Sequence, residues 1–249
     1  MFAAFKQAYD RDGFVIVPNF LPLDDFAELT GNLDRYIRDV VPLLPDADAF
    51  YHDRSRPETL KQMQHMGVDP FFRRYAEHPR WRQLAETLVG ENVQGDAPEW
   101  FNKPPATNHV TPPHQDNYYF CLRPANVVTI WLALDRVDEE NGCLRYAQGS
   151  HRHGVRPHGA AGILGFSQGI TDYGVIDSVH ETKILLEPGD AVAHHCNTIH
   201  RAEANRSPER QRRAFAVVYK ATSCRLDEDA FARYQQSMQL QHATMGLTT

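Results

Sequence analysis

The spacing of apolar residues predicts mainly helices in the first ninety residues of the chain. The run 13–20 is rich in β-branched residues but contains Pro18, which is typical of an early or edge strand. Helical spacing follows, with acidic residues at its start, so a helix is predicted over about 24–40. Its apolar face would comprise Phe26, Leu29, Leu33, Ile37 and Val40.

Two further helix starts, and a further helix that ends at Gly90, are predicted before residue 91. Ser55-Arg56-Pro57-Glu58 has the pattern of a capping box with proline at the first helical position. The helix that it opens would bury Leu60 and Met63 and end near Gly67. Asp69-Pro70 repeats the start pattern, and another helix would end at Gly90. The apolar face of that last helix would comprise Trp81, Leu84, Ala85 and Leu88.

From about residue 92 the pattern changes to short runs of period two, separated by Pro, Gly and Asn. The clearest predicted strand is 125–137, which is apolar on both faces, as expected of a strand covered on both sides. Other predicted strands are 143–146, 183–186, 191–194 and 214–219. Without a repeat or linker, one domain over 1–249 is expected. It would have a helical third at about 1–91, a strand-rich core at about 92–222 and a final helix at about 227–240.

Composition narrows the classes of partner. The chain has 249 residues, 42% hydrophobic and 23% charged, and a net charge of −6, which argues against a nucleic acid or an anionic membrane as partner. No apolar run approaches the roughly 20 residues of a membrane helix, and the start lacks the apolar stretch of a signal peptide. The cysteines lack disulfide-like spacing, so free thiols and a cytoplasmic location are expected. They are Cys121, Cys143, Cys196 and Cys224.

The main candidate for chemistry is the H-x-D sequence of His114 and Asp116. In an extended strand, residues two apart project from the same face, so both side chains could hold one metal ion. A second, distant histidine would complete a triad that leaves three coordination positions open, as suits iron(II). H-x-D alone is common at protein surfaces, so the hypothesis depends on its companions. His200 fits best as the third ligand, and His194 stays an alternative.

An arginine follows His200 at a useful place. Arg212 stands at the start of the predicted strand 214–219. Its planar guanidinium could bind the far carboxylate of a dicarboxylate such as 2-oxoglutarate in a bidentate manner. Solvated arginines are also expected in this polar stretch, and Arg210 and Arg213 remain alternatives for the same role.

Several segments, in order from residue 12 to 219, resemble the phytanoyl-CoA dioxygenase family of iron(II)- and 2-oxoglutarate-dependent oxygenases. The segments are Asp12–Pro18, Asn102–Pro105, His114–Asp116, Trp131, Asn141–Leu144, Gly149–His151, Pro188–Asp190, His200 with Asn205 and Ser207, and Arg212–Ala214. The resemblance implies a mainly β fold, a double-stranded β-helix (a jelly-roll, cupin-like barrel) flanked by N-terminal and C-terminal α-helices.

The resemblance also assigns residues. It implies that His114, Asp116 and His200 bind iron(II), and that Arg212 and Trp131, together with Thr129, form the 2-oxoglutarate site. The stretch from His200 to Arg212 is one residue longer than the commonest spacing in the family. Family members that halogenate have a small residue in place of the aspartate, so Asp116 favours hydroxylation over halogenation.

The expected activity is hydroxylation of an unactivated C–H bond in a small-molecule metabolite, using iron(II), 2-oxoglutarate and dioxygen and releasing succinate and carbon dioxide. Substrate-facing candidates are Lys103, Asn117, Tyr118 and Arg145, and the stretch 154–173 is expected to form a mobile lid. The alternatives are an acyl-CoA α-hydroxylase, a non-catalytic jelly-roll binding protein and a zinc hydrolase. A basic collar for the acyl-CoA phosphates would comprise Arg152, His153, Arg156 and His158. The sequence predicts no oligomeric state.

Overall fold

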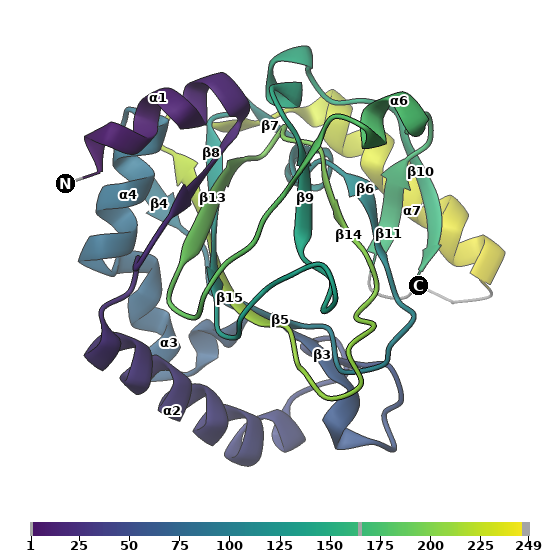
Figure 1. The fold of residues 1–249 in the computed structure, drawn as a ribbon. Helices are drawn as coiled ribbons and strands as arrows, with labels where there is room; N and C mark the ends of the chain where they lie inside the picture. The colour runs from purple at the N-terminus through teal and green to yellow at the C-terminus, as the bar shows by residue number, and fades with distance from the viewer. Residues whose placement is uncertain (1, 164–165, 246–249) are drawn as a thin grey trace.

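The computed structural model describes residues 2–163 and 166–245, which form a mixed α/β fold built on antiparallel sheets (Figure 1). The larger sheet has eight strands, in the order β1-β13-β8-β15-β5-β3-β2, with β4 also paired to β15. Its strands are β1 (Phe14–Val17), β2 (Ala49–Tyr51), β3 (Leu60–Met63), β4 (Val93–Gly95), β5 (Glu99–Asn102), β8 (Val127–Ala133), β13 (Ala191–His195) and β15 (Arg213–Ala221).

A four-stranded sheet in the order β12-β9-β14-β6 faces the larger one (Figure 1). Its strands are β6 (Thr111–His114), β9 (Leu144–Ala147), β12 (Glu181–Lys183) and β14 (His200–Ala202). Two short ladders join β10 (His158–Ile163) to β11 (Phe166–Ile170) and β7 (Leu122–Arg123) to β16 (Arg225–Leu226). Within residues 2–163 and 166–245 the two main sheets do not close into one hydrogen-bonded barrel. The barrel expectation is therefore confirmed only as facing antiparallel sheets.

Strand β8 runs through the centre of the molecule, and all seven of its residues are buried. Val128, Ile130 and Leu132 belong to the apolar cluster under the helices, whereas Trp131 and Ala133 belong to a second cluster between the sheets. A strand covered on both faces loses the usual alternation of apolar and polar residues. The predicted central strand is thus confirmed, and its inner face looks into the space between the sheets.

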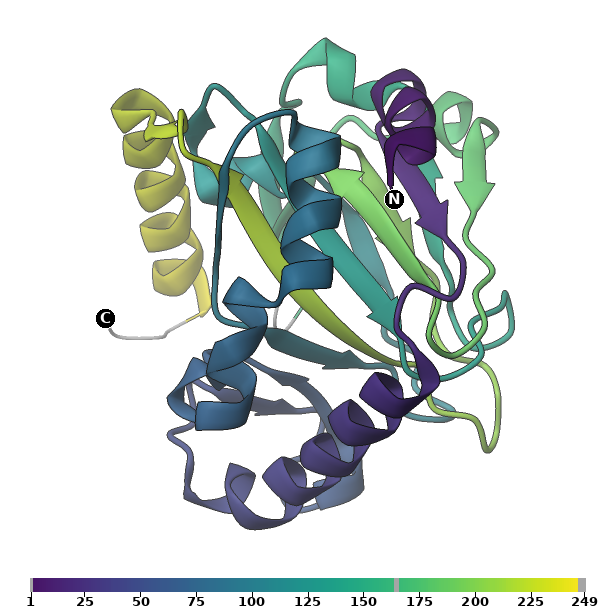
Figure 2. The ribbon, with the colours of Figure 1, turned by 90° about the vertical axis from the view of Figure 1, so that its left-hand side faces the viewer.

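Helices α1 to α4 pack on the outer face of the larger sheet, and α4 lies across it in Figure 2, whereas α7 packs against α5 and β10. The helices are α1 (Ala3–Asp12), α2 (Leu23–Asp39), α3 (Pro70–Arg73), α4 (Pro79–Val89), α5 (Asn117–Phe120), α6 (Val175–Ser178) and α7 (Glu228–Met245). Trp81 and Leu84 of α4 are fully buried in the cluster that contains Phe215 of β15. Among the described helices, none combines the length and apolarity needed to cross a membrane.

Three local expectations can be compared with the structure. The capping-box helix is wrong, because Pro57–Thr59 forms a single 3-10 turn and Leu60–Met63 is strand β3, paired with β2 and β5. Helix α1 was not predicted, although Phe2 and Tyr9 are buried on one side of it. The expected lid contains the β10–β11 ladder, and its residues 164 and 165 lie outside the described ones.

Candidate metal centre and co-substrate site

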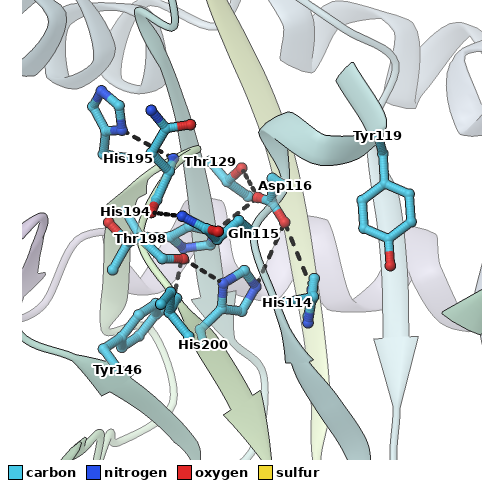
Figure 3. Close-up of polar contacts among 12 residues, drawn as sticks. His114, Gln115, Asp116, Tyr119, Thr129, Tyr146, His194, His195, Thr198 and His200 are labelled. Atoms are coloured by element: carbon cyan, nitrogen blue, oxygen red, sulfur yellow. Dashed lines mark hydrogen bonds and ion pairs between the residues drawn. The ribbon is translucent and has the colours of Figure 1, made fainter. Parts of the chain in front are cut away.

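Two histidines meet across neighbouring strands of the smaller sheet. His114 ends β6 and stands directly opposite His200 of β14 in the antiparallel register. Asp116 follows two residues later with helical backbone angles at the start of α5, rather than in the extended strand that the sequence predicted. Its Oδ1 lies 3.7 Å from Nε2 of His114 and 3.5 Å from Nε2 of His200. The predicted convergence is confirmed, with one ligand atom of each residue within 4.8 Å of the others (Figure 3).

Backbone carbonyls set the tautomer of both histidines. Nδ1 of His114 lies 2.8 Å from the carbonyl oxygen of Pro112, and Nδ1 of His200 lies 3.0 Å from that of Thr198. A carbonyl oxygen only accepts, so each Nδ1 carries the hydrogen and each Nε2 keeps its lone pair. Ligating histidines are commonly oriented by such a contact on the other ring nitrogen. Both lone pairs are therefore presented toward Asp116, where a cation would sit.

Asp116 is held by side chains of the larger sheet. Nε2 of His194 donates to its Oδ2 at 3.0 Å, and the hydroxyl of Thr129 donates to the same oxygen at 3.0 Å (Figure 3). Nδ1 of His194 in turn accepts from the hydroxyl of Tyr146 at 2.8 Å. His194 therefore contacts a ligand residue and lies outside the three-residue cluster. Thr129 was predicted to contact 2-oxoglutarate, and its hydroxyl donates to the carboxylate of Asp116.

The protonation states of the cluster suit a metal. Burial lowers the pKa of His114, although the charge of Asp116 opposes this effect, and burial together with repulsion from His114 lowers the pKa of His200 further. Burial alone would raise the pKa of the Asp116 carboxyl, but the charge of His200 and the hydrogen bond from His194 hold it well below its usual range. Neutral imidazoles beside an ionised carboxylate are the forms that bind a divalent cation.

Gln115, between the two ligand residues of the H-x-D sequence, points away from them and fixes two other segments. Its Nε2 donates to the carbonyls of Gly154 and Asn197 at 2.8 and 2.7 Å, and its Oε1 accepts from the backbone of Arg156 at 2.7 Å. The side chain is fully buried. The sequence analysis assigned it no role, although a buried glutamine flanked by two inward-facing ligands must project to the opposite side.

A cavity of about 420 Å³ opens beside the cluster and receives residues of both sheets. Besides the three clustered residues, its wall includes Thr129, Trp131, Lys103, Glu99, Phe101, Tyr119 and Arg212. Arg212 is only 5% exposed, and its guanidinium carbon lies 5.3 Å from the centre of the Trp131 ring. Within the described chain it forms no ion pair with a carboxylate, and its Nε has no hydrogen-bond partner. Burial holds its pKa down at about 10.

The neighbouring arginines have partners elsewhere. Arg210 forms an ion pair with Asp138, and Arg213 forms one with Asp135. Because Arg212 and Ala214 share one face of the chain, both point inward, as the strand parity predicted. Of the three arginines considered, Arg212 is the one that lines the cavity.

The four residues predicted to face the substrate divide into two groups. Lys103 lines the cavity, where its ammonium donates to the carbonyl of His109 at 2.7 Å. Asn117, Tyr118 and Arg145 do not line it. Their side chains contact, respectively, the backbone of Leu122, the ring of His158 and the carboxylates of Glu139 and Glu181.

Glu99 is a cavity residue that the sequence analysis missed. Glu99 and Phe101 both project from the inner face of β5 into the cavity. Trp100, between them, projects to the other face and is buried in the cluster under the helices. Burial raises the pKa of the Glu99 carboxyl to about 7, and the charge of Asp116 adds to this. A carboxylate at an inward position of a period-two run was the available signal, but β5 itself was not predicted.

The chain is similar to known proteins in sequence and in fold. The family model described as phytanoyl-CoA dioxygenase (PhyH) matches residues 9–214. The peroxisomal phytanoyl-CoA dioxygenase of Rattus norvegicus is 29% identical over 238 residues, which cover 88% of this chain and 68% of the rat protein.

Two solved structures show a similar fold. The epimerase SnoN, in complex with Fe3+, alpha ketoglutarate and nogalamycin RO, has a TM-score of 0.72 at 23% identity and covers 93% of this chain and 88% of its own. EctD from S. alaskensis, with 2-oxoglutarate and 5-hydroxyectoine, has a TM-score of 0.70 at 20% identity, and the match covers 89% of this chain and 76% of the EctD chain. With the family model matching most of the chain and the H-x-D and distant histidine brought together, this protein belongs to the phytanoyl-CoA dioxygenase family of Fe(II)- and 2-oxoglutarate-dependent oxygenases.

Proposed function

We propose that this protein is a dioxygenase that hydroxylates an unactivated C–H bond of a small-molecule metabolite and converts 2-oxoglutarate to succinate and carbon dioxide. His114, Asp116 and His200 would hold iron(II). The facing sheets would be the core of a double-stranded β-helix, in one domain. A cavity of about 420 Å³ is of the size that encloses a small metabolite.

The observation that carries this proposal is the environment of Arg212. A buried guanidinium without a carboxylate partner is costly, so such a group is expected where a ligand completes the pair. Arg212 lines the same cavity as the metal ligands, with its guanidinium beside the Trp131 ring. We infer that it binds the 5-carboxylate of 2-oxoglutarate, whose negative charge would offset the burial and the repulsion from Arg212 that lower the pKa of Lys103.

The bound iron would supply the redox chemistry that couples dioxygen to the decarboxylation of 2-oxoglutarate. The protein residues would provide position and protonation state. His194 and Thr129 fix Oδ2 of Asp116, which leaves Oδ1 on the side of the two imidazoles. Trp131 and Tyr119 line the cavity beside them. Because Asp116 keeps a carboxylate on the metal, hydroxylation is favoured over halogenation.

An acyl-CoA substrate is less well supported. The basic collar expected for its phosphates would include Arg152 and Arg156. Arg156 is paired with Asp172 and Asp177, and Arg152 donates to the backbone of Arg11. Cations that are already engaged offer little to a polyphosphate.

The test is release of succinate by the purified protein with iron(II), 2-oxoglutarate and a panel of small metabolites, with Asp116→Ala as control. Under anaerobic conditions, iron(II) with 2-oxoglutarate should also give a weak visible absorption band that Asp116→Ala lacks. This band separates the oxygenase from a zinc hydrolase or a binding protein. Succinate release no greater than in Asp116→Ala, with no band, would refute the proposal.

A further inference from the structure

Glu99 places a carboxyl group in the cavity at a distance from the proposed 2-oxoglutarate anchor. Its backbone pairs with Ala216 of β15, whereas Arg212 precedes the first residue of that strand. Four residues of extended chain separate Arg212 from Ala216, which corresponds to roughly 13 Å along the strand. The two charged side chains therefore serve different parts of the cavity, and a co-substrate held by Arg212 leaves the part beside Glu99 for another molecule.

The groups around Glu99 do not neutralise it. Its side chain is hydrogen-bonded to Gln62, a neutral amide, and its nearest charged neighbours include the carboxylates of Asp116 and Asp96, with His65 opposing them. Within residues 2–163 and 166–245, no lysine, arginine or histidine forms an ion pair with Glu99. A carboxyl group enclosed in a cavity without a positive partner is costly when ionised, so the cavity favours a ligand that brings the missing charge.

Aromatic rings complete the surroundings of that charge. Phe101 lies two residues along from Glu99 in β5, and Tyr119 and Tyr234 also line the cavity. The faces of such rings attract cations and contact the carbon atoms next to them. A carboxylate together with aromatic rings is a common way to bind an ammonium group.

We propose that Glu99 binds a positively charged nitrogen of the primary substrate, so that the substrate class is small metabolites with an ammonium or other cationic nitrogen. This inference rests on the proposed function, because it takes the cavity beside the metal to be the substrate site. Glu99 would set which molecules are accepted and how they lie relative to the metal.

The test compares matched pairs of compounds in which the amine of one member is either absent from the other or replaced by a hydroxyl. The panel includes norleucine against hexanoate, norvaline against pentanoate, 1-aminohexane against hexan-1-ol, and cyclohexylmethylamine against cyclohexylmethanol. Binding is measured by anaerobic titration calorimetry on the protein loaded with iron(II) and 2-oxoglutarate. At least one amine should bind at least about tenfold more tightly than its counterpart without the amine, as one charge-assisted hydrogen bond allows.

Glu99→Gln keeps the size of the side chain and its hydrogen bond to Gln62, and it should reduce that ratio to near one. Asp96→Asn is the matched control, because it removes one negative charge three residues away, where Asp96 is paired with Lys220 outside the cavity. It should keep the ratio. Circular dichroism checks that both variants are folded.

Three results would overturn the inference: no amine binds more tightly than its counterpart, Glu99→Gln keeps the preference, or both variants lose it. The absorption band of the wild-type protein with iron(II) and 2-oxoglutarate is the independent check. With the band present, failure of the amine test rejects the substrate class alone. Absence of the band rejects the oxygenase proposal itself.

Discussion

The imidazole of His194 determines which oxygen of Asp116 is available to a metal. It donates to Oδ2 and is itself held by the hydroxyl of Tyr146, so Oδ1 is left on the side of His114 and His200. Residues that orient a metal ligand commonly change metal affinity 10- to 100-fold when they are replaced. His194 is thus a positioning residue.

His194→Leu should weaken iron(II) binding by roughly 10- to 100-fold without abolishing it, because all three ligands remain. The dissociation constant is measured by anaerobic titration. Tyr146→Phe is the graded control, since it removes only the hydroxyl behind His194, and it should have a smaller effect. Affinity unchanged in His194→Leu would contradict the positioning role, and complete loss of binding would indicate a ligand instead.

Glu99 should make the metal-free protein less stable as the pH rises. Its folded pKa of about 7 lies above the ordinary value of 4.5, so the folded state binds more protons than the unfolded state between these values. Stability from this group is therefore fully present below about pH 4.5 and is lost as the pH rises through 7. The groups acting on it are Gln62, Asp116, His65 and Asp96.

Glu99→Gln should accordingly raise the free energy of unfolding by about 1–2 kcal/mol at pH 8, and by much less at pH 5. Urea titrations of the metal-free protein at pH 5 and pH 8 measure this free energy of unfolding. Asp96→Asn should stay within about 0.5 kcal/mol of wild type at both, as expected for an exposed ion pair. An equal gain for Glu99→Gln at pH 5 and pH 8 would contradict the assignment.

Residue patterns located the metal ligands but not their surroundings. The two histidines, Asp116 and Arg212 could be predicted because each belongs to a short motif or stands at a strand start. The support from His194 and the inward position of Glu99 arise from pairing between strands far apart in sequence, such as β5 with β15. A local pattern contains no information on that pairing.

At the scale of elements, the turn from β6 into α5 is a junction between segments. Gln115 accepts from the backbone of Arg156 and donates to the carbonyls of Gly154 and Asn197, so it connects the strand that carries His114 to the segments before β10 and β14. The Gln115 side chain is fully buried, whereas the backbone groups that it contacts are partly exposed.

Gln115→Ala should lower the free energy of unfolding by about 2–4 kcal/mol, because it removes the three hydrogen bonds of a fully buried side chain and leaves a cavity in its place. Chemical denaturation measures the loss. Gln94→Ala, at an exposed position of β4, should change stability by no more than about 0.5 kcal/mol. A similar small change in both variants would show that water replaces the Gln115 contacts.

Local sequence patterns predicted some elements correctly, but pairing between distant strands determined others. The helices α2 and α4 were predicted because their apolar spacing is long and regular. The stretch from Ser55 has a helix start, yet its Thr59 hydroxyl bonds back to the carbonyl of Asp53 and Leu60–Met63 pairs with β5. Pairing of these four residues with neighbouring strands stabilises the chain more than the N-terminal cap would stabilise a short helix.

At the scale of the whole molecule, the site joins the two sheets. His114 and His200 come from the smaller sheet, whereas His194 and Thr129, which hold Asp116, come from the larger one. Ligands that bind only the folded state stabilise it according to their concentration relative to the dissociation constant. Iron(II) and 2-oxoglutarate should therefore stabilise the entire fold.

Iron(II) with 2-oxoglutarate at about 100 times their dissociation constants should raise Tm by roughly 5–10 °C. Anaerobic differential scanning calorimetry measures the shift. Addition of a chelator should reverse it, and Asp116→Ala should show almost none. The same shift in Asp116→Ala as in the wild type would place the binding elsewhere.

The pairing of His114 with His200 has a consequence for how this sequence tolerates changes of length. A single inserted or deleted residue within β6 or β14 would turn one imidazole to the opposite face of its strand. The turn between β14 and β15 is under no such constraint, because Asn205 and Ser207 close it with their own hydrogen bonds. An inserted residue should therefore be tolerated better in that turn than within either of the two strands.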